Sequence, residues 1–375
     1  MGETLAHRGP DAEGVVAWDA HGARVQDGEA VVGLVHRRLS ILDLSEKGSQ
    51  PMTLGGDAPW IVYNGECYNF RELRKDLEEG GCRFASDCDT EVLLHGIDRW
   101  GLDELLERMN GMFAFALWSP REQRLELVRD RMGQKPLYYA ELPDGGLVFA
   151  SEMKALFSTG MVDTEALDLT ALDQFWALGY TCCGRTAYKA IKQLLPGERA
   201  TWSPGKPVER QTWWSVPAWG ATEGESRSVE EWADELEALL VDAIRSRLIA
   251  DVPVGLFLSG GIDSSLICAL AAKEGADLTA YTIQFAEAEY DETEHAKGVA
   301  EHLGLTHRIM RVDDDLSAYF DAIAEGFDEP FGDLSCIPTW FLCREARREV
   351  TVALSGDAGD ELFGGYDDYR FGMGP

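Results

Sequence analysis

The stretch VGLFLSGGIDSSL, residues 254–266, decides the architecture of the second half of the chain. Its short apolar start predicts a strand buried on both faces, and the SLICALAAK that follows the turn has the spacing of a helix. The polar cluster SGGIDSS therefore lies at a strand-to-helix turn. Paired glycines let backbone N–H groups approach a ligand closely, and a helix N-terminus favours an anion. The turn predicts a phosphate site.

Strand and helix patterns alternate through residues 228–375. Ser228 and Glu231 form a capping box ahead of a helix whose apolar residues fall on one face, namely Val229, Trp232, Leu236, Leu239, Leu240 and Ile244. The segments that follow are VPVGLFL, SSLICALAAK, LTAYTIQF, TEHAKGVAEHL, HRIMRV, helices near 316–325 and 339–348, and VTVALSG. This repetition predicts a doubly wound parallel sheet in an α/β protein, with ligands at the carboxyl ends of the strands.

The first half of the chain has a different pattern of predicted strands and helices. Residues 1–158 contain short strand-type runs, AVVGLVH, PWIVYNG, GMFAFALW, RLELVRD and GLVFAS, and two helical stretches, FRELRKDLEE and DTEVLLHGIDRWGLDELLER. They predict an α+β domain with a mainly antiparallel sheet. Residues 159–227 are expected to be a connecting segment, ending in a Pro-, Gly- and Trp-rich linker over 203–226 that packs its tryptophans on one of the domains.

Composition narrows the class of protein. The chain has 375 residues, which suits about two domains, and 45% of them are hydrophobic. A formal charge of -32 disfavours nucleic acid as a partner. No apolar run is long enough to span a membrane, and no basic n-region precedes an apolar h-region as in a signal peptide. We expect a cytoplasmic protein with small-molecule substrates, and a homo-oligomer stays open. The eight cysteines show no metal-type spacing and are expected to be free thiols.

The SGGIDSS turn contains neither the lysine of a P-loop nor the spacing of a dinucleotide-binding fingerprint. Its hydroxyls and backbone amides suit pyrophosphate, and the Asp263 carboxylate beside a phosphate is explained by a bridging Mg²⁺. The competing interpretation is a helix start at which Asp263 or Ser264 only caps the backbone. A second glycine-rich acidic turn, SGDAGDELFGGY at 355–366, also follows a predicted strand and favours the ligand site, with Asp263 and Asp360 sharing the metal.

These motifs resemble the glutamine-dependent asparagine synthetases. SGGIDSS is similar to the pyrophosphate loop of the ATP pyrophosphatases, and YDETEHAKGVAEHLG, DEPFGDLSCIPT and SGDAGDELFGGY are similar to the asparagine synthetases in particular. The resemblance implies ATP and Mg²⁺ as cofactors, with Asp263 and Asp360 on the metal and Asp357 beside an acyl-adenylate. The implied ATP-binding residues are Phe257, Ser259, Gly260, Gly261, Ile262, Asp263, Ser264, Ser265, Ile283, Ser355 and Gly356. The family more often has glycine at the position of Ala358. If the backbone there is left-handed, alanine is costly at that position.

The first domain resembles the glutaminase domain of the same family, which implies an Ntn-hydrolase-like sandwich. Five motifs carry this likeness: HRGPD, HRRLSILDLSEKGSQPM, YNGECYN, SDCDTEV and RDRMGQKPLYYA. Arg38 can clamp the α-carboxylate of glutamine, Asp89 can pair with its α-ammonium, and Asn64 with the N–H of Gly65 can form an oxyanion hole. The implied glutamine-binding set is Arg38, Ile41, Asn64, Gly65, Glu66 and Asp89, and the implied catalytic residues are Asn64, Gly65 and Asp357.

The family's glutaminases begin with a cysteine after the initiator Met, whereas this chain begins Met1-Gly2-Glu3 and its first cysteine, Cys67, lies inside YNGECYN. Cys67 has no free α-amine and does not suit the role. We expect a chain that lacks the N-terminal strand with its cysteine and the end of the second domain. The alternative is a glutaminase that has lost its chemistry, attached to a synthetase that uses free ammonia or another amine.

The sequence thus predicts amidation of aspartate to asparagine through a β-aspartyl-adenylate, with ammonia from glutamine. Two rivals stay open: an amide ligase of the β-lactam synthetase or lasso-peptide cyclase kind, and an inactive fragment that binds nucleotide. Aspartate as the acid comes from resemblance alone.

Overall fold

The computed structural model describes residues 1–26, 29–217, 227–275, 278–285, 291–312, 316–366 and Tyr369. The chain divides into two compact units. Unit 1 comprises Met1–Ala221 together with Phe327–Asp333, and unit 2 comprises Thr222–Gly326 together with Leu334–Pro375. Each unit has its own sheets and its own core, so the two are described separately.

Unit 1 contains three antiparallel sheets. The first has the order β2-β1-β3, the second β11-β10-β6-β5-β4 and the third β8-β7-β9. Their strands are β1 (Ala12–Trp18), β2 (Arg24–Val25), β3 (Val32–Arg38), β4 (Trp60–Cys67), β5 (Gly111–Ser119), β6 (Arg124–Arg129), β7 (Tyr138–Glu141), β8 (Leu147–Ala150), β9 (Lys192–Gln193), β10 (Glu198–Trp202) and β11 (Glu209–Thr212). The predicted antiparallel α+β domain is confirmed.

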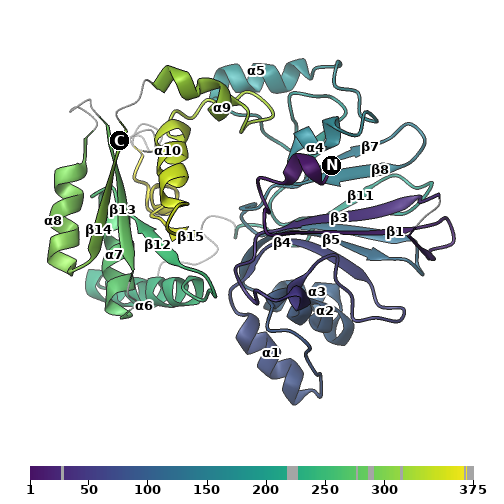
Figure 1. The fold of residues 1–375 in the computed structure, drawn as a ribbon, viewed down its shortest axis with the longest axis horizontal. Helices are drawn as coiled ribbons and strands as arrows, with labels where there is room; N and C mark the ends of the chain where they lie inside the picture. The colour runs from purple at the N-terminus through teal and green to yellow at the C-terminus, as the bar shows by residue number, and fades with distance from the viewer. Residues whose placement is uncertain are drawn as a thin grey trace. The chain divides into compact units, whose positions relative to one another are not determined.

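Strand β5 explains the layering of unit 1, because side chains alternate between the two faces of a strand. Ala116 and Trp118 belong to a core cluster with Trp18 of the first sheet, so two sheets pack face to face. Phe113 and Phe115 are fully buried on the other face. Figure 1 shows α2 and α3 against one side of the sheet that contains β4 and β5. The long apolar run GMFAFALW is therefore buried on both faces.

The helices of unit 1 follow the predicted patterns. The stretch FRELRKDLEE forms α1 (Phe70–Glu79), and the longer stretch forms α2 (Asp89–Trp100) and α3 (Leu102–Arg108). It divides at Gly101, whose φ of 83° lies in the left-handed region that glycine enters without strain. The remaining helices are α4 (Met153–Phe157), α5 (Leu169–Leu178) and the short 3₁₀ helices Glu3–Leu5 and Glu46–Gly48.

The predicted linker contains structure up to residue 217, while residues 218–226 lie outside the described residues. Strand β11 falls within it and extends the five-stranded sheet. Trp213 stacks on Phe113 with ring centroids 6.3 Å apart, and its indole N–H donates to the carbonyl of Arg129 at 3.1 Å. The tryptophan therefore packs on unit 1.

Residues Phe327–Asp333 are distant in sequence but belong to unit 1. The Asp328 carboxylate accepts the backbone N–H of Lys154 at 3.0 Å and pairs with its ammonium group at 3.3 Å. The Glu329 carboxylate accepts the N–H of Ala187 at 2.8 Å and the hydroxyl of Thr181 at 3.2 Å. Two acidic side chains thus fasten the DEPFGD segment to unit 1.

Unit 2 is built on a parallel sheet of order β14-β13-β12-β15. Its strands are β12 (Val254–Phe257), β13 (Thr279–Phe285), β14 (Thr306–Val312) and β15 (Val352–Leu354). Its helices are α6 (Val229–Arg247), α7 (Ile262–Lys273), α8 (Thr293–Leu303), the 3₁₀ helix Leu316–Tyr319, α9 (Phe320–Ala324), α10 (Cys336–Ala346) and α11 (Gly359–Phe363). Tyr290, the first residue of the YDETEHAKGVAEHLG motif, lies outside the described residues.

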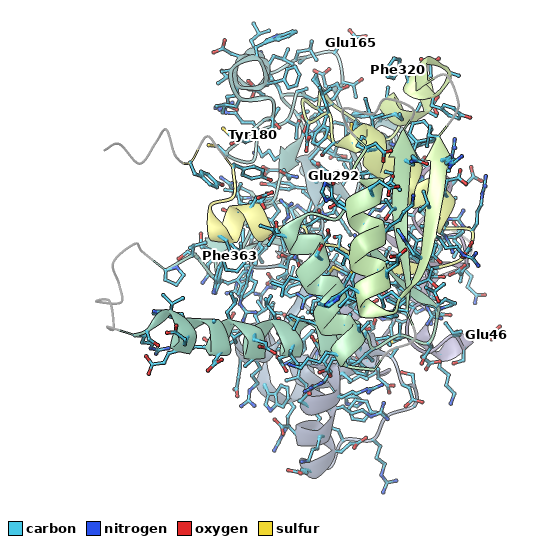
Figure 2. All side chains as sticks on the ribbon, turned by 90° about the vertical axis from the view of Figure 1, so that its left-hand side faces the viewer. Glu46, Glu165, Tyr180, Glu292, Phe320 and Phe363 are labelled. Atoms are coloured by element: carbon cyan, nitrogen blue, oxygen red, sulfur yellow. The ribbon has the colours of Figure 1, made fainter. Side chains whose placement is uncertain are left out.

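Both faces of this sheet are covered. Leu256 and Ala280 pack with residues of α6, α7 and α8 on one face, and Figure 2 shows α7 and α8 side by side, with Glu292 at the start of α8. Tyr281 packs with Ala346 of α10 on the other face, where Figure 1 shows α10. Helices on both faces of a parallel sheet confirm the doubly wound α/β prediction.

Helix α6 begins as predicted but is buried less than predicted. The Ser228 hydroxyl accepts the N–H of Glu231 at 3.2 Å, and the Glu231 carboxylate accepts the N–H of Ser228 at 2.8 Å. Ile244 is 3% exposed, whereas Val229 is 79% exposed. Only the C-terminal half of α6 packs into the core with α7 and β12. Most of the apolar residues of its N-terminal half are not covered by any described element of unit 2.

Candidate active sites

The SGGIDSS turn of unit 2 is held by its own serine side chains. The Ser264 hydroxyl lies 2.9 Å from that of Ser259, accepts the Ser259 N–H at 3.3 Å and donates to the Gly261 carbonyl at 3.2 Å. Gly260 has a φ of 91°, and a Cβ there would come 2.7 Å from the backbone nitrogen of Ala296 in α8. A glycine is therefore required where the turn meets α8.

The second acidic turn lies directly against the first. Strands β12 and β15 are parallel neighbours, so both turns emerge at the same edge of the sheet. A Cβ on Gly356 would come 2.7 Å from the backbone nitrogen of Ser264, and a Cβ on Gly359 would come 2.5 Å from Cγ of Asp263. The glycines of the 355–366 turn let its backbone approach the start of α7.

The acidic side chains of this edge differ in their partners. Asp357 accepts the hydroxyl of Ser355 at 2.8 Å, and Glu361 accepts the hydroxyl of Tyr366 at 3.0 Å. Within the described residues, neither Asp263 nor Asp360 forms an ion pair with a basic side chain. No side chain caps α7, which argues against a capping role for Asp263.

Asp263 and Asp360 are the side chains at this edge of the sheet that could hold a Mg²⁺ ion together with a nucleotide. Among the described residues, no group of three or more His, Cys, Asp or Glu side chains could hold a metal by itself. Mg²⁺ in nucleotide sites is usually bound by one or two carboxylates together with the phosphates of the substrate. Asp263 and Asp360, on two turns in contact, supply carboxylates of that type.

The two residues assigned to adenine lie on neighbouring strands. Phe257 ends β12 and is paired with Tyr281, so Ile283 lies two residues further along β13. Their side chains face the α10 side of the sheet, where Phe257 packs near Tyr281 and Ile283 near Phe341. Their backbone groups are at the edge of the sheet where the turns are.

Unit 1 contains a cavity of about 330 Å³. All six residues assigned to glutamine line it: Arg38, Ile41, Asn64, Gly65, Glu66 and Asp89. They come from β3, the loop after it, β4 and the start of α2. Sequence positions 51 residues apart thus meet at one cavity whose size suits an amino acid.

Arg38 is 8% exposed and much of its guanidinium group is already engaged. It donates to the carbonyls of Ser45 at 2.7 Å, Leu42 at 3.1 Å and Asp43 at 2.5 Å. A Cβ on Gly48 would come 2.1 Å from its Nη2. A guanidinium group has five N–H donors, and these contacts to described residues use one N–H of Nη1 and those of Nη2, which leaves the Nε–H and the second N–H of Nη1. This second role of Arg38, holding the 42–45 loop beside the cavity, was not predicted from the sequence.

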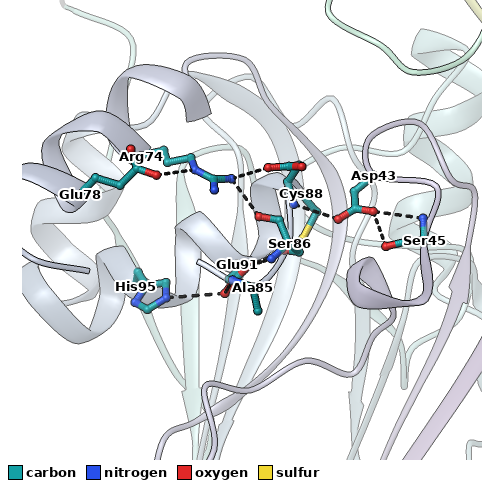
Figure 3. Close-up of polar contacts among 10 residues, drawn as sticks. Asp43, Ser45, Arg74, Glu78, Ala85, Ser86, Cys88, Glu91 and His95 are labelled. Atoms are coloured by element: carbon teal, nitrogen blue, oxygen red, sulfur yellow. Dashed lines mark hydrogen bonds and ion pairs between the residues drawn. The ribbon is translucent and has the colours of Figure 1, made fainter. Parts of the chain in front are cut away.

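Asp43 joins that loop to the one that precedes Asp89 (Figure 3). Its carboxylate accepts the Ser45 hydroxyl at 2.5 Å and the backbone N–H of Asp87 at 2.9 Å. Arg38 holds the first loop and Asp89 begins the helix after the second. The side chains assigned to the α-carboxylate and the α-ammonium group of glutamine are therefore positioned by one connected set of hydrogen bonds.

Glu91 fixes the start of α2 from the other side. Its carboxylate is 7% exposed and accepts the N–H groups of Ala85 at 2.8 Å and Ser86 at 2.7 Å. His95 lies 3.7 Å from the same carboxylate, one turn along the helix (Figure 3). These contacts orient the first turn of α2, which carries Asp89.

Asp89 and Glu66 are two buried carboxyl groups at the cavity. Burial raises the pKa of Asp89 to about 6, although a hydrogen bond from the N–H of Cys67 at 2.9 Å opposes the shift. Burial also raises the pKa of Glu66 well above its ordinary value; neighbouring Asp89 raises it further and Lys135 opposes it. Two carboxyl groups of this kind suit a cationic ligand group, since an ammonium ion relieves both burial and mutual repulsion.

The residues assigned to the oxyanion hole are close-packed. Asn64 donates its amide to the Ser151 hydroxyl at 3.4 Å, a long contact that a ligand oxygen could replace. A Cβ on Gly65 would come 2.2 Å from the carbonyl oxygen of Met112, because β4 and β5 are paired there. Only glycine fits at this position.

Cys67 has the properties of a core residue. It is 1% exposed, and burial raises the pKa of its thiol well above the ordinary value, with Asp89 adding to the shift. A thiol must ionise to act as a nucleophile. The structure therefore agrees with the sequence argument against Cys67.

Sequence reasoning missed several polar residues that line the cavity, among them His36, Lys135 and Ser151. The Nε2 of His36 lies 3.1 Å from the carbonyl of Tyr63, and burial lowers the pKa of His36 to about 4. Burial also lowers the pKa of Lys135, against the attraction of Glu66. Both residues stand inside quoted motifs, HRRLSILDL and RDRMGQKPLYYA, which is the signal that could have identified them.

The chain combines an α+β sandwich that contains an amino-acid-sized cavity with a doubly wound domain that carries two glycine-rich turns, which are the two folds expected of a two-part amidotransferase. Residues 1–214 match the family model described as "Glutamine amidotransferase domain", and residues 235–373 match "Asparagine synthase". The chain belongs to the family of glutamine-hydrolysing asparagine synthetases.

Two curated relatives illustrate the similarity. Asparagine synthetase [glutamine-hydrolyzing] 1 of Bacillus subtilis is 36% identical over 372 residues, which cover 99% of this chain and 56% of that protein. Putative asparagine synthetase [glutamine-hydrolyzing] 2 of Methanocaldococcus jannaschii is 34% identical over 387 residues, covering 98% of this chain and 72% of that protein. The chain thus spans little more than half of the Bacillus relative.

Among solved structures, the glutamine phosphoribosylpyrophosphate amidotransferase of Bacillus subtilis aligns with 90% of this chain and 88% of its own, at 15% identity and a TM-score of 0.42.

In the part of the chain that the structure describes, no helix is both long and apolar enough to cross a membrane.

Proposed function

We propose that this chain carries the amidotransferase and nucleotide-binding parts of an enzyme that converts aspartate to asparagine. ATP activates the aspartate side-chain carboxylate as a β-aspartyl-adenylate with release of pyrophosphate, and ammonia from glutamine then displaces AMP. The relatives' names describe this nitrogen donor and product for those proteins.

The observation that carries the proposal is the contact between the two glycine-rich turns at one edge of the sheet. Backbone amides of Gly260 and Ile262 lie at the start of α7 and suit a pyrophosphate group. The N–H of Gly261 instead donates to the Ser259 hydroxyl at 3.2 Å and would have to exchange that partner for the ligand. Ser355 and Gly356 meet the nucleotide from the second turn, and Asp357 lies beside the acyl group. Such preorganised donors stabilise charge on the leaving pyrophosphate.

Mg²⁺ held by Asp263 and Asp360 would neutralise phosphate charge as a Lewis acid. Asp263 is otherwise a carboxylate beside a site for anions, which is unfavourable without a cation. Phe257 and Ile283 offer backbone groups to adenine at the same edge of the sheet. The proposed site therefore contacts the nucleotide both at its base and at its phosphates.

In unit 1, glutamine is proposed to occupy the cavity. Its α-ammonium group pairs with the Asp89 carboxylate, and Glu66 lies beside the same group. The remaining N–H groups of Arg38 donate to its α-carboxylate. Asn64 and the N–H of Gly65 face the side-chain amide carbon, where negative charge develops during hydrolysis. Ile41 supplies apolar contact in the wall of the cavity.

Calorimetric titration with ATP, with and without Mg²⁺, tests the nucleotide site, and Asp263→Asn tests the metal. We expect the variant to weaken Mg²⁺-ATP binding far more than metal-free binding. Any turnover should give AMP and pyrophosphate on chromatography. ADP and phosphate as main products would contradict the proposal, because no P-loop lysine is present for γ-phosphoryl transfer.

Titration with L-glutamine tests the cavity in unit 1, with D-glutamine as the control because its α-groups cannot reach Asp89 and Arg38 together. We expect binding of the L-isomer that is lost in Asp89→Ala. Equal binding of both isomers, or binding unaffected by the substitution, would place glutamine elsewhere.

A further inference from the structure

A buried hydrogen-bond relay ends one residue before the SGGIDSS turn. The hydroxyl of Thr282 in β13 donates to the carbonyl of Leu258 at 2.5 Å, and it lies 2.8 Å from Nε2 of His307 in β14. Thr282 is 3% exposed and Leu258 is 2% exposed. The contact between Thr282 and Leu258 is therefore shielded from water, where a missing partner is most costly, whereas His307 at the other end of the relay is partly exposed.

The directions of the two hydrogen bonds follow from the chemistry of a hydroxyl group. Thr282 has one hydroxyl hydrogen and gives it to Leu258, so it must accept at its oxygen from His307. His307 thus carries its hydrogen on Nε2. Burial lowers the pKa of His307, which favours the neutral ring.

Leu258 is the point at which β12 leaves the sheet. The last pair between β12 and β13 is Phe257 with Tyr281, and the N–H of Leu258 still donates to the Tyr281 carbonyl at 2.9 Å. Its carbonyl then accepts a side-chain hydroxyl. The peptide groups on both sides of Leu258 are fixed to β13, and so is the direction in which the chain enters the turn.

This anchor continues into the turn through its serines. Ser259, the next residue, gives its N–H to the hydroxyl of Ser264, which also contacts Gly261. A shift of the Leu258 carbonyl would therefore be passed to the backbone amides at the start of α7. Those amides are the anion donors of the proposed nucleotide site.

We propose that Thr282 and His307 are positioning residues of the nucleotide site: their relay holds the Leu258 carbonyl, and through it the SGGIDSS turn, in the shape that receives a pyrophosphate group. The assignment of the ligand rests on the proposed function, whereas the positioning of the turn does not. Neither residue is required to touch the nucleotide.

The matched pair Thr282→Val and Thr282→Ser separates this role from packing. Valine keeps the shape of threonine and removes the hydroxyl, whereas serine keeps the hydroxyl and removes a methyl group from the core. For His307, Gln retains an Nε2 donor and Leu does not. A purely packing role predicts that serine is at least as damaging as valine.

The first measurement is calorimetric binding of Mg²⁺-ATP and of inorganic pyrophosphate to the full chain. We expect Thr282→Val to weaken both by about tenfold, from a lost hydrogen bond and two unpaired buried groups, and Thr282→Ser by no more than about twofold. The double variant Thr282→Val/His307→Leu should be little worse than Thr282→Val alone, because one relay is broken in either case. Equal losses for Val and Ser, or additive losses in the double variant, would overturn the relay.

The second measurement is hydrogen exchange of the backbone amides of residues 259–264 without nucleotide. Exchange should accelerate in Thr282→Val and His307→Leu, and stay near the unsubstituted rate in Thr282→Ser and His307→Gln. Unchanged exchange in the Val and Leu variants would overturn the positioning role. If the unsubstituted chain bound no nucleotide while exchange changed as expected, the proposed function would fail and the positioning role would stand.

Discussion

The carboxylate of Asp263 lies against the backbone of Gly359: a Cβ atom added to Gly359 would come 2.5 Å from Cγ of Asp263 and 2.8 Å from its Oδ1. The two residues are 96 positions apart and belong to the two turns at the edge of the parallel sheet. The space that Gly359 leaves open is the space in which the proposed metal ligand lies.

Gly359→Ala should therefore displace the Asp263 carboxylate without altering its charge. We expect the gain in ATP affinity that Mg²⁺ provides to fall at least about tenfold, because metal sites demand close ligand geometry. Gly298→Ala in α8 is the control, since nothing lies within 4 Å of a Cβ there. Titrations of both variants with and without Mg²⁺ measure the effect, and an unchanged Mg²⁺ dependence in Gly359→Ala would argue against Asp263 as a ligand.

Ala358 has a φ of 73°, in the left-handed region that alanine enters at a cost. Ala358→Gly should raise the free energy of unfolding by about 1 kcal/mol, because glycine adopts this backbone without strain. Ala269→Gly, in the interior of α7, should lower it by a similar amount. Urea unfolding of the two variants provides the measurement. A loss of stability in both would mean that the strain at Ala358 is relieved in solution.

Asp89 should make stability depend on pH. Its folded-state pKa of about 6 lies above the ordinary aspartate pKa of 3.8, so the fold favours the neutral carboxyl group. This contribution is present below the unfolded-state pKa and is lost as pH rises through about 6. Relative to Asp89→Asn, the unsubstituted chain should lose about 1.4 kcal/mol of unfolding free energy between pH 5.0 and 7.5.

Urea unfolding at the two pH values, with the exposed Asp98→Asn of the same helix as control, tests this expectation. The sign is opposite for ligand binding, because the ionised carboxylate is the form that pairs with an ammonium group. L-glutamine should bind more tightly as pH rises through about 6. Tighter binding at pH 5 would rule out the proposed pairing.

Arg38→Lys should be far from conservative. A lysine cannot reproduce the fork that holds three carbonyl groups of the 42–45 loop, so unfolding free energy should fall by about 2 kcal/mol or more, and L-glutamine binding should be lost with the shape of the loop. The neighbouring Arg37→Lys keeps a partly exposed pair with Glu13 and should cost less than about 1 kcal/mol. Thermal unfolding and calorimetry of the two variants compare them directly. Similar behaviour would show that Arg38 is an ordinary ion-pairing residue.

Local patterns in the sequence determined most of the elements. FRELRKDLEE and TEHAKGVAEHL carry the helical period and coincide with α1 and α8, and the Ser228–Glu231 capping box begins α6 as predicted. Alternating strands and helices determined the doubly wound sheet of unit 2, because parallel strands need crossover connections. The motifs also predicted six of the residues that line the cavity of unit 1.

Only the tertiary structure decided which polar groups already have partners. Arg38 makes three hydrogen bonds to carbonyls of the 42–45 loop. The hydroxyl of Ser264, which was predicted to bind phosphate, instead donates to the Gly261 carbonyl within the same turn. Neither could be predicted, because a hydrogen bond depends on the position of a backbone carbonyl to within a fraction of an ångström. The Thr282–His307 relay has the same origin: it joins three strands that are neighbours in space and far apart in sequence, and hydrophobic periodicity fixes the faces of strands but not the contacts between their polar side chains.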